Sequence, residues 1–191
     1  MEVLGVTFAK PASAARWRGV CLGLMLACAT GAQATTPTLE ASVKATYLYK
    51  FAPFVEWPAA AFASPTSPFV LCIVGDDPFG AALDQAVSGQ RVGDHPAVVR
   101  RLSRVEAGSG CHILYLSGSR TQSIPDAIRG VRGDPVLTVT DRGAASSGAV
   151  IQFVVKDNRV RFDIDTAAAS ANRVAISSKL LSLALSSKAG T

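Results

Sequence analysis

The chain has 191 residues, of which 49% are hydrophobic and 17% are charged, and its formal net charge at pH 7 is +5. A chain of this length is long enough to form one domain with a proper hydrophobic core. So small a positive charge suits solubility and weak attraction to anionic surfaces, and it gives no reason to expect a nucleic-acid-binding protein.

The first 34 residues have the pattern of a secretory signal peptide. Three basic residues come first: Lys10, Arg16 and Arg18. An uncharged apolar run over residues 19–30 follows, and then an A-x-A motif that predicts cleavage between Ala34 and Thr35. The run has about 12 residues, too few to cross ~30 Å of hydrocarbon. The alternatives are an uncleaved membrane anchor and a lipoprotein leader ending at Cys28.

Cleavage leaves residues 35–191, which we expect to form a single domain. The loss of three basic residues and one acidic residue lowers the formal net charge from +5 to +3. No second apolar run in this part approaches the length of a membrane span.

Residues 39–55 predict a helix with one broad apolar face. Val43, Tyr47, Phe51 and Phe54 follow the helical spacing. Pro53 lies inside the pattern and lacks a backbone N–H, so we expect a kink or an early end there.

Residues 69–74 form an unbroken apolar run that ends at Gly75, which indicates a strand buried on both faces. Asp77 is a good N-cap and Pro78 suits the first position of a following helix. The buried stripe of that helix is expected to be Phe79, Leu83 and Val87.

Three further strands are expected at residues 97–102, 112–116 and 135–140, with a helix between Gln122 and Gly130. Residues 149–155 and 159–165 then flank Lys156-Asp157-Asn158 and predict an antiparallel hairpin with one wet face. Ser177 or Ser178 can cap a final helix. Its core-like residues are Leu180, Leu181, Leu183, Ala184 and Leu185.

This order of elements predicts an α/β fold. We expect a mainly parallel sheet sandwiched by helices, with a C-terminal antiparallel hairpin and a final helix.

Two cysteines, Cys72 and Cys111, remain after removal of the leader. In an oxidising compartment they most simply form a disulfide, and closing a loop of about 40 residues contributes roughly 4 kcal/mol. A catalytic thiol and a metal site are the alternatives. Metal ligands are scarce, because His95 and His112 are the only histidines of the chain.

The search for a catalytic motif returns no serine-nucleophile, zinc-protease or phosphate-loop pattern. We therefore expect no catalytic residues, no cofactor and no metal site. Asp76 and Asp77 follow a strand and precede a helix, where open α/β sheets bind ligands. They could bind a cation or an amine with Phe79 beside them, or the segment could be a plain turn.

Other candidate contact residues are basic or aromatic. Arg159, Arg161 and Arg173 could hold a carboxylate or phosphate if they converge near the hairpin. Arg100, Arg101 and Arg104 form a cluster that could dock an acidic partner or form a solvated strand edge. Five aromatic residues exceed what one small helix must bury, so part of their surface could contact a partner: Tyr47, Tyr49, Phe51, Phe54 and Trp57.

Six segments resemble, in the same order, those of YfiR-like periplasmic proteins. They are residues 44–58, 71–80, 110–115, 136–141, 159–164 and 176–181. They span nearly the whole of the expected domain. Pro53 is a departure, since the family usually carries a helix-compatible residue there.

The resemblance implies regulation rather than catalysis. The best-understood members are dimeric periplasmic repressors that bind the periplasmic part of an inner-membrane diguanylate cyclase and lower its cyclic-di-GMP output. An outer-membrane lipoprotein relieves the repression by sequestering the repressor. In such members the cysteines that match Cys72 and Cys111 form a disulfide. Related domains are fused to sensor kinases, so a small-molecule-binding sensor module is the alternative function.

Overall fold

The computed structural model describes residues 38–141, 143 and 148–188. They belong to one unit, Thr35–Thr191. The expected signal peptide and its cleavage site between Ala34 and Thr35 lie outside the described residues, so both stay predictions.

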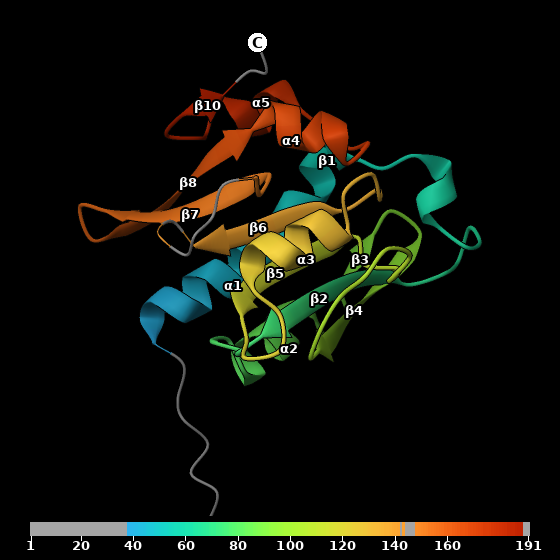
Figure 1. The fold of residues 1–191 in the computed structure, drawn as a ribbon, viewed down its shortest axis with the longest axis horizontal. Coiled ribbons are helices and arrows are strands. Elements are labelled where there is room, and N and C mark those ends of the chain that lie inside the picture. The colour runs from blue at the N-terminus through green and yellow to red at the C-terminus, as the bar shows by residue number, and fades with distance from the viewer. Residues whose placement is uncertain (1–37, 142, 144–147, 189–191) are drawn as a thin grey trace, which may run out of the picture. The chain divides into compact units, whose positions relative to one another are not determined.

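A mixed sheet forms the centre of this unit (Figure 1). Its strands are β2 (Phe69–Gly75), β3 (Arg91–Val92), β4 (His95–Leu102), β5 (Ile113–Gly118), β6 (Leu137–Asp141), β7 (Ile151–Lys156), β8 (Arg159–Asp165) and β10 (Ser187–Lys188). They are arranged in the order β10-β8-β7-β6-β5-β2-β4-β3. The five strands β4, β2, β5, β6 and β7 run parallel, while β8 is antiparallel to β7 and β3 is antiparallel to β4.

Helices cover both faces of the sheet, which confirms the expected α/β sandwich (Figure 1). The helices are α1 (Leu39–Phe51), α2 (Ala81–Val87), α3 (Ile124–Gly130), α4 (Thr166–Ala171) and α5 (Ser178–Leu181). On one face, α1 and α2 pack against odd-numbered residues of β2 such as Leu71 and Ile73. On the other face, α3 packs against Cys72 and Val74. Residues 69–74 are all buried, because each pleat of β2 points into one of the two cores.

The first helix ends at Phe51, earlier than the spacing of apolar residues alone predicts. A 3-10 turn (Ala52–Phe54) contains Pro53 near its start, as expected of a residue that cannot donate a backbone hydrogen bond. A small second sheet follows, in which β1 (Val55–Glu56) pairs with β9 (Ala175–Ile176). This pairing attaches the segment after α1 to the segment before α5.

The start of α2 was predicted wrongly. Asp77 Oδ1 accepts hydrogen bonds from the backbone N–H groups of Phe79 and Gly80, so these residues form a turn before the helix. Gly80 has a φ of 49° and is the N-cap, and the helix begins at Ala81. Phe79, Leu83 and Val87 are nevertheless buried as expected.

The C-terminal hairpin has the expected strands and a two-residue turn. Asp157 and Asn158 both have a positive φ, which Asp and Asn tolerate and which suits the twist of a tight hairpin. Ser177 caps α5, but the helix has only four residues and Leu183 is 55% exposed. The expected final helix is confirmed, and Leu180 is buried in it, but the chain turns back soon after Leu181 and pairs Ser187 and Lys188 with β8.

Candidate functional site

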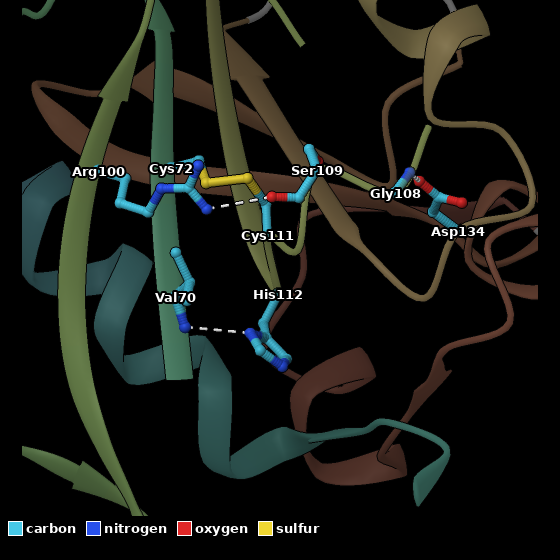
Figure 2. The surroundings of a disulfide bond; sticks show 8 residues. All are labelled: Val70, Cys72, Arg100, Gly108, Ser109, Cys111, His112 and Asp134. Atoms are coloured by element: carbon cyan, nitrogen blue, oxygen red, sulfur yellow. Dashed lines mark hydrogen bonds between the residues drawn. A yellow bond between two sulfur atoms is a disulfide. The ribbon is translucent and has the colours of Figure 1, made fainter. Parts of the chain in front are cut away.

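Cys72 and Cys111 form a disulfide between neighbouring strands (Figure 2). Cys72 lies in the middle of β2, and Cys111 lies just before β5, which pairs with β2 in parallel. Both cysteines are buried. The segment that carries Cys111 is held further by Arg100, which donates to the Ser109 carbonyl at 3.1 Å. The bond therefore stabilises the sheet, and neither sulfur is a free thiol.

His112 follows the disulfide and accepts a hydrogen bond at Nδ1 from the backbone N–H of Val70, at 3.0 Å (Figure 2). The ring lies between Phe62 and Phe69, with centroid distances of 4.4 and 4.9 Å. Burial lowers the pKa of His112 to about 4, against the opposing effect of the Ala61 carbonyl. The histidine is therefore a neutral hydrogen-bond acceptor at physiological pH.

Trp57 lies in the same aromatic cluster, where its ring is 5.1 Å from Phe69 and 6.3 Å from His112. The other members of the aromatic-rich segment also pack inward. Phe51 is 1% exposed, and Tyr47, Tyr49 and Phe54 are partly buried against the core. Most of the aromatic surface that sequence alone left unexplained is thus used in packing.

Asp77 is held by an ion pair rather than left open for a ligand. Arg101 Nε lies 2.7 Å from Asp77 Oδ2, and its Nη1 lies 2.9 Å from Asp84 Oδ1. Burial disfavours the charged carboxylate, but Arg101 and the two backbone N–H groups outweigh it and hold the pKa of Asp77 below its usual value. Arg104 pairs with Glu106, so the basic cluster is largely neutralised.

Asp76 lines an open hollow at the carboxyl end of the sheet, together with the loop after β5. Gly118 at the end of β5 lines it as well, and the loop contributes Ser119, Arg120 and Thr121. The hollow lies where neighbouring loops leave β2 and β5 in opposite directions along the sheet, a position that binds ligands in many α/β folds. Phe79 is fully buried and does not line it.

A second site is a cleft of about 450 Å³ between α1 and the β7–β8 hairpin. It is lined by Leu39, Glu40, Val43, Tyr47, Val155, Asn158, Arg159, Val160 and Arg161. Two of these side chains are large, apolar and exposed: Leu39 at 82% and Val155 at 50%. Arg159 and Arg161 are exposed, and neither forms an ion pair with any other described residue.

A charge network around the buried Lys44 supports the α1 wall of this cleft. Lys44 Nζ lies 2.6 Å from Glu40 Oε1 and 2.8 Å from Asp141 Oδ1. Tyr115 donates its hydroxyl to Asp141 Oδ2 at 3.0 Å. Burial alone lowers the pKa of Lys44, but the two carboxylates outweigh it and the pKa is raised. Burial, followed by the charge of Asp141, raises the pKa of Tyr115.

The predicted arginine triplet does not converge. Arg159 and Arg161 lie together at the start of β8, but Arg173 follows α4, which begins where β8 ends. The aspartates are separate as well, because three strands lie between β2 and β8 in the sheet. Asp76 and Asp77 therefore do not share a pocket with Arg159 and Arg161, and the two candidate sites are separate.

Comparison with known protein families shows to which family the chain is related. The family model described as YfiR/HmsC-like matches residues 41–185. The chain belongs to this family. No curated protein matches the chain at a significant level.

The family is one of regulatory, non-catalytic, periplasmic proteins, and membership supports a role in diguanylate cyclase signalling. Two observations describe the chain itself. No helix among the described residues is long and apolar enough to cross a membrane. Within the same residues, no group of three or more His, Cys, Asp or Glu side chains could hold a metal ion.

Leu39 and Val43, on the α1 side of the cleft, were missed from the sequence, although Tyr47 beside them was named as a possible contact. Leu39, Val43 and Tyr47 recur at every fourth position, which places them on one stripe of α1. Leu39 begins that stripe and is almost fully exposed, so the stripe extends past the core. This excess was the available signal. That the stripe faces the hairpin could be known only from the packing of α1 on the sheet.

Proposed function

We propose that this protein is a periplasmic repressor of an inner-membrane diguanylate cyclase. It binds the periplasmic region of the cyclase, favours the inactive state and lowers cyclic-di-GMP output. The observation that carries the proposal is the family match over residues 41–185. The expected export signal in residues 1–34 supports it, because a periplasmic repressor must leave the cytosol.

The α1–hairpin cleft supports a role in protein binding. Exposed apolar residues here are bordered by arginines that pair with no other described residue, and arginine and apolar side chains are enriched in interaction surfaces. Repression needs only a difference in affinity between two states of the cyclase. A difference of about 3 kcal/mol shifts their ratio more than a hundredfold. In this scheme the repressor acts as a homodimer, and an outer-membrane lipoprotein relieves repression by sequestering it.

Gene deletion tests the proposal directly. Loss of the gene should raise cellular cyclic-di-GMP and biofilm, and expression of the full chain should restore the lower level. A variant that lacks residues 2–34 is the matched control, since it should remain in the cytosol and fail to restore. Unchanged cyclic-di-GMP in a deletion strain whose parent expresses the protein would contradict repression.

A second candidate function is a small-molecule sensor that feeds a membrane signalling protein. The cleft volume of about 450 Å³ is the observation that favours it, because ligand pockets commonly enclose about 300–1,000 Å³. A ligand at 100 times its dissociation constant should raise the free energy of unfolding by about 2.7 kcal/mol. A thermal-shift screen of periplasmic metabolites measures this, and no shift across a broad panel would count against the sensor.

A further inference from the structure

The outer edge of β8 is open over its first half. Even-numbered residues of β8 direct their backbone groups away from β7: Phe162 accepts from Leu185 N at 2.8 Å, and Ile164 donates to Ser186 O at 3.0 Å. Pairing with β10 begins only at Ile164. By the same alternation, the N–H and C=O of Val160 point outward. Neither group has a backbone partner among residues 38–141, 143 and 148–188.

The side chains of β8 divide by chemistry between the two faces. Phe162 packs against Tyr47 and Phe51, at centroid distances of 5.9 and 5.1 Å, so it faces α1. Val160 shares that face because side chains alternate along a strand. Arg159 and Arg161 project to the opposite face, where they are exposed.

The cleft runs beside this open edge. Its strand wall consists of residues 158–161, and its other wall is the apolar stripe of α1, led by Leu39 and Val43. An extended chain placed along the edge would therefore meet the outward backbone groups of Val160. It would have an apolar wall on one side and, on the other, two arginines that form no ion pair within the described part of the chain. Exposed edges of this kind are ready templates for strand addition.

We propose that the edge of β8 at Val160 binds an extended acidic segment of a protein partner by strand addition. Apolar residues of that segment pack toward α1, and alternate acidic residues lie opposite Arg159 and Arg161. Main-chain hydrogen bonds supply affinity, while the alternation of apolar and acidic side chains supplies specificity. This inference deepens the proposed function, on which it rests for the partner's identity.

The charges favour a different protein over a second copy of this chain. Antiparallel pairing of two β8 edges about Val160 would set Arg159 of one copy against Arg161 of the other. Like charges directly opposite one another destabilise a strand pair. An acidic segment instead neutralises both arginines, which have no ion-pair partner among the described residues.

Two substitutions at one position separate backbone pairing from side-chain contact. Val160→Pro removes the outward N–H but leaves the β7–β8 ladder intact, since proline is tolerated at an edge. Val160→Ala shortens the side chain and keeps the N–H. The probe is a fluorescent seven-residue peptide of alternating Glu and Val, and its Lys–Val counterpart is the charge control. Binding to the protein of residues 35–191 is measured by fluorescence anisotropy.

The Glu–Val peptide should bind the wild type at least about tenfold more tightly than the Lys–Val peptide. Val160→Pro should weaken binding about tenfold, whereas Val160→Ala should weaken it about threefold or less. Equal binding by Val160→Pro and the wild type would overturn the proposal. If Val160→Pro fails to fold, the double variant Arg159→Glu/Arg161→Glu decides: it should prefer the Lys–Val peptide, and an unchanged preference would also overturn the proposal.

Sedimentation and cell assays distinguish the remaining outcomes. The wild type and Val160→Pro should have the same oligomeric state, and a monomer produced only by Val160→Pro would assign the edge to a second copy and overturn the proposal. In cells, failure of the wild-type gene to lower cyclic-di-GMP contradicts the proposed function but leaves the peptide result standing. Full repression by Val160→Pro contradicts the strand-addition proposal alone.

Discussion

Lys44 of α1 lies 2.8 Å from a carboxylate oxygen of Asp141 at the end of β6, and this ion pair joins the first helix to the centre of the sheet. The lysine is 7% exposed, which is rare for an ammonium group without partners. Glu40 and Tyr115 complete the network. The pair therefore holds one wall of the cleft against the sheet.

Replacing Lys44 by Met should lower the free energy of unfolding by about 1–2 kcal/mol, because it leaves the Asp141 carboxylate without a cation. The loss is smaller than for a fully buried pair, since the Asp141 side chain is 40% exposed. Urea denaturation at pH 7 measures it, and Lys50→Met, an exposed position on the same helix, is the control. Equal losses in the two variants would contradict a specific role for Lys44.

The same pair predicts a pH dependence. The pKa of Lys44 is raised in the folded state, so its stabilisation is complete below the unfolded value of 10.5 and is lost as the pH rises through the folded value. The difference in unfolding free energy between wild type and Lys44→Met should therefore stay constant from pH 7 to pH 9. A steady decline over that range would show that the lysine loses its proton too early.

Gly75→Ala should be among the most damaging single substitutions in the protein. An added Cβ would lie 2.0 Å from the Gly118 carbonyl oxygen, and the φ of Gly75 is +94°. We expect a loss of at least about 3 kcal/mol, since backbone cannot move aside cheaply. Gly89→Ala is the matched control, because its φ is +68° but no atom of the residues that the structure describes lies within 4 Å of the added Cβ. It should cost about 1–2 kcal/mol in thermal or urea unfolding.

Removal of the disulfide should lower the free energy of unfolding, and it should not give the protein a catalytic activity. The free energy of unfolding of the double variant Cys72→Ala/Cys111→Ala should be about 4 kcal/mol lower than that of the wild type. This is the value expected when a loop of this length is no longer closed in the unfolded chain. Reduced wild-type protein should unfold at a similar urea concentration. A loss below about 1 kcal/mol would mean that the bond adds little to the sheet contacts around it.

His112 should make stability fall as the solution becomes acidic. The folded pKa of about 4 is below the model-peptide value of 6.5, so between these values the unfolded chain takes up a proton that the folded chain refuses. The contribution of neutral His112 to the free energy of unfolding is fully present above pH 6.5. It declines toward pH 4, by at most about 3 kcal/mol. The physical cause is burial, together with the Val70 N–H that faces Nδ1 and would oppose a second donor.

His112→Asn keeps an acceptor for Val70 and removes the titration. Its urea midpoint should change less than that of the wild type between pH 6.5 and pH 5. His95→Asn changes the histidine on the other side of Phe62 and should retain most of the wild-type dependence. If both variants and the wild type share one pH profile, the dependence arises elsewhere.

Several elements of the fold could be predicted because their causes are local. The run of residues 69–74 is apolar at every position, and only a strand inside a sandwiched sheet buries all six. The alternation in residues 159–165 and the Asp157-Asn158 turn together specify a hairpin. The disulfide could be predicted because residues 35–191 contain only two cysteines, Cys72 and Cys111. Errors occurred where a side chain formed an unexpected local hydrogen bond. Asp77, for example, accepts from the backbone N–H of Phe79, and α2 therefore begins only at Ala81.

The candidate site was only half predictable. Arg159 and Arg161 were found from the pattern of the hairpin, but Arg173 was grouped with them although α4 separates it from their end of β8. Leu39 and Val43 were not assigned to any site. Contacts between α1 and the hairpin join parts of the chain far apart in sequence, and periodicity within either segment carries no information about them.

The amino-acid sequence by itself determined the class of fold, the buried central strand, the hairpin turn and the family. These depend on apolar spacing, turn residues and ordered motifs, which act over a few residues. Only the tertiary structure decided that β10 pairs with β8 from Ile164 onward, which leaves Val160 without a backbone partner among the described residues, and that Lys44 forms an ion pair with Asp141. Strand order and helix docking are set by long-range packing of the two cores, and that packing places exposed groups together which no local pattern relates.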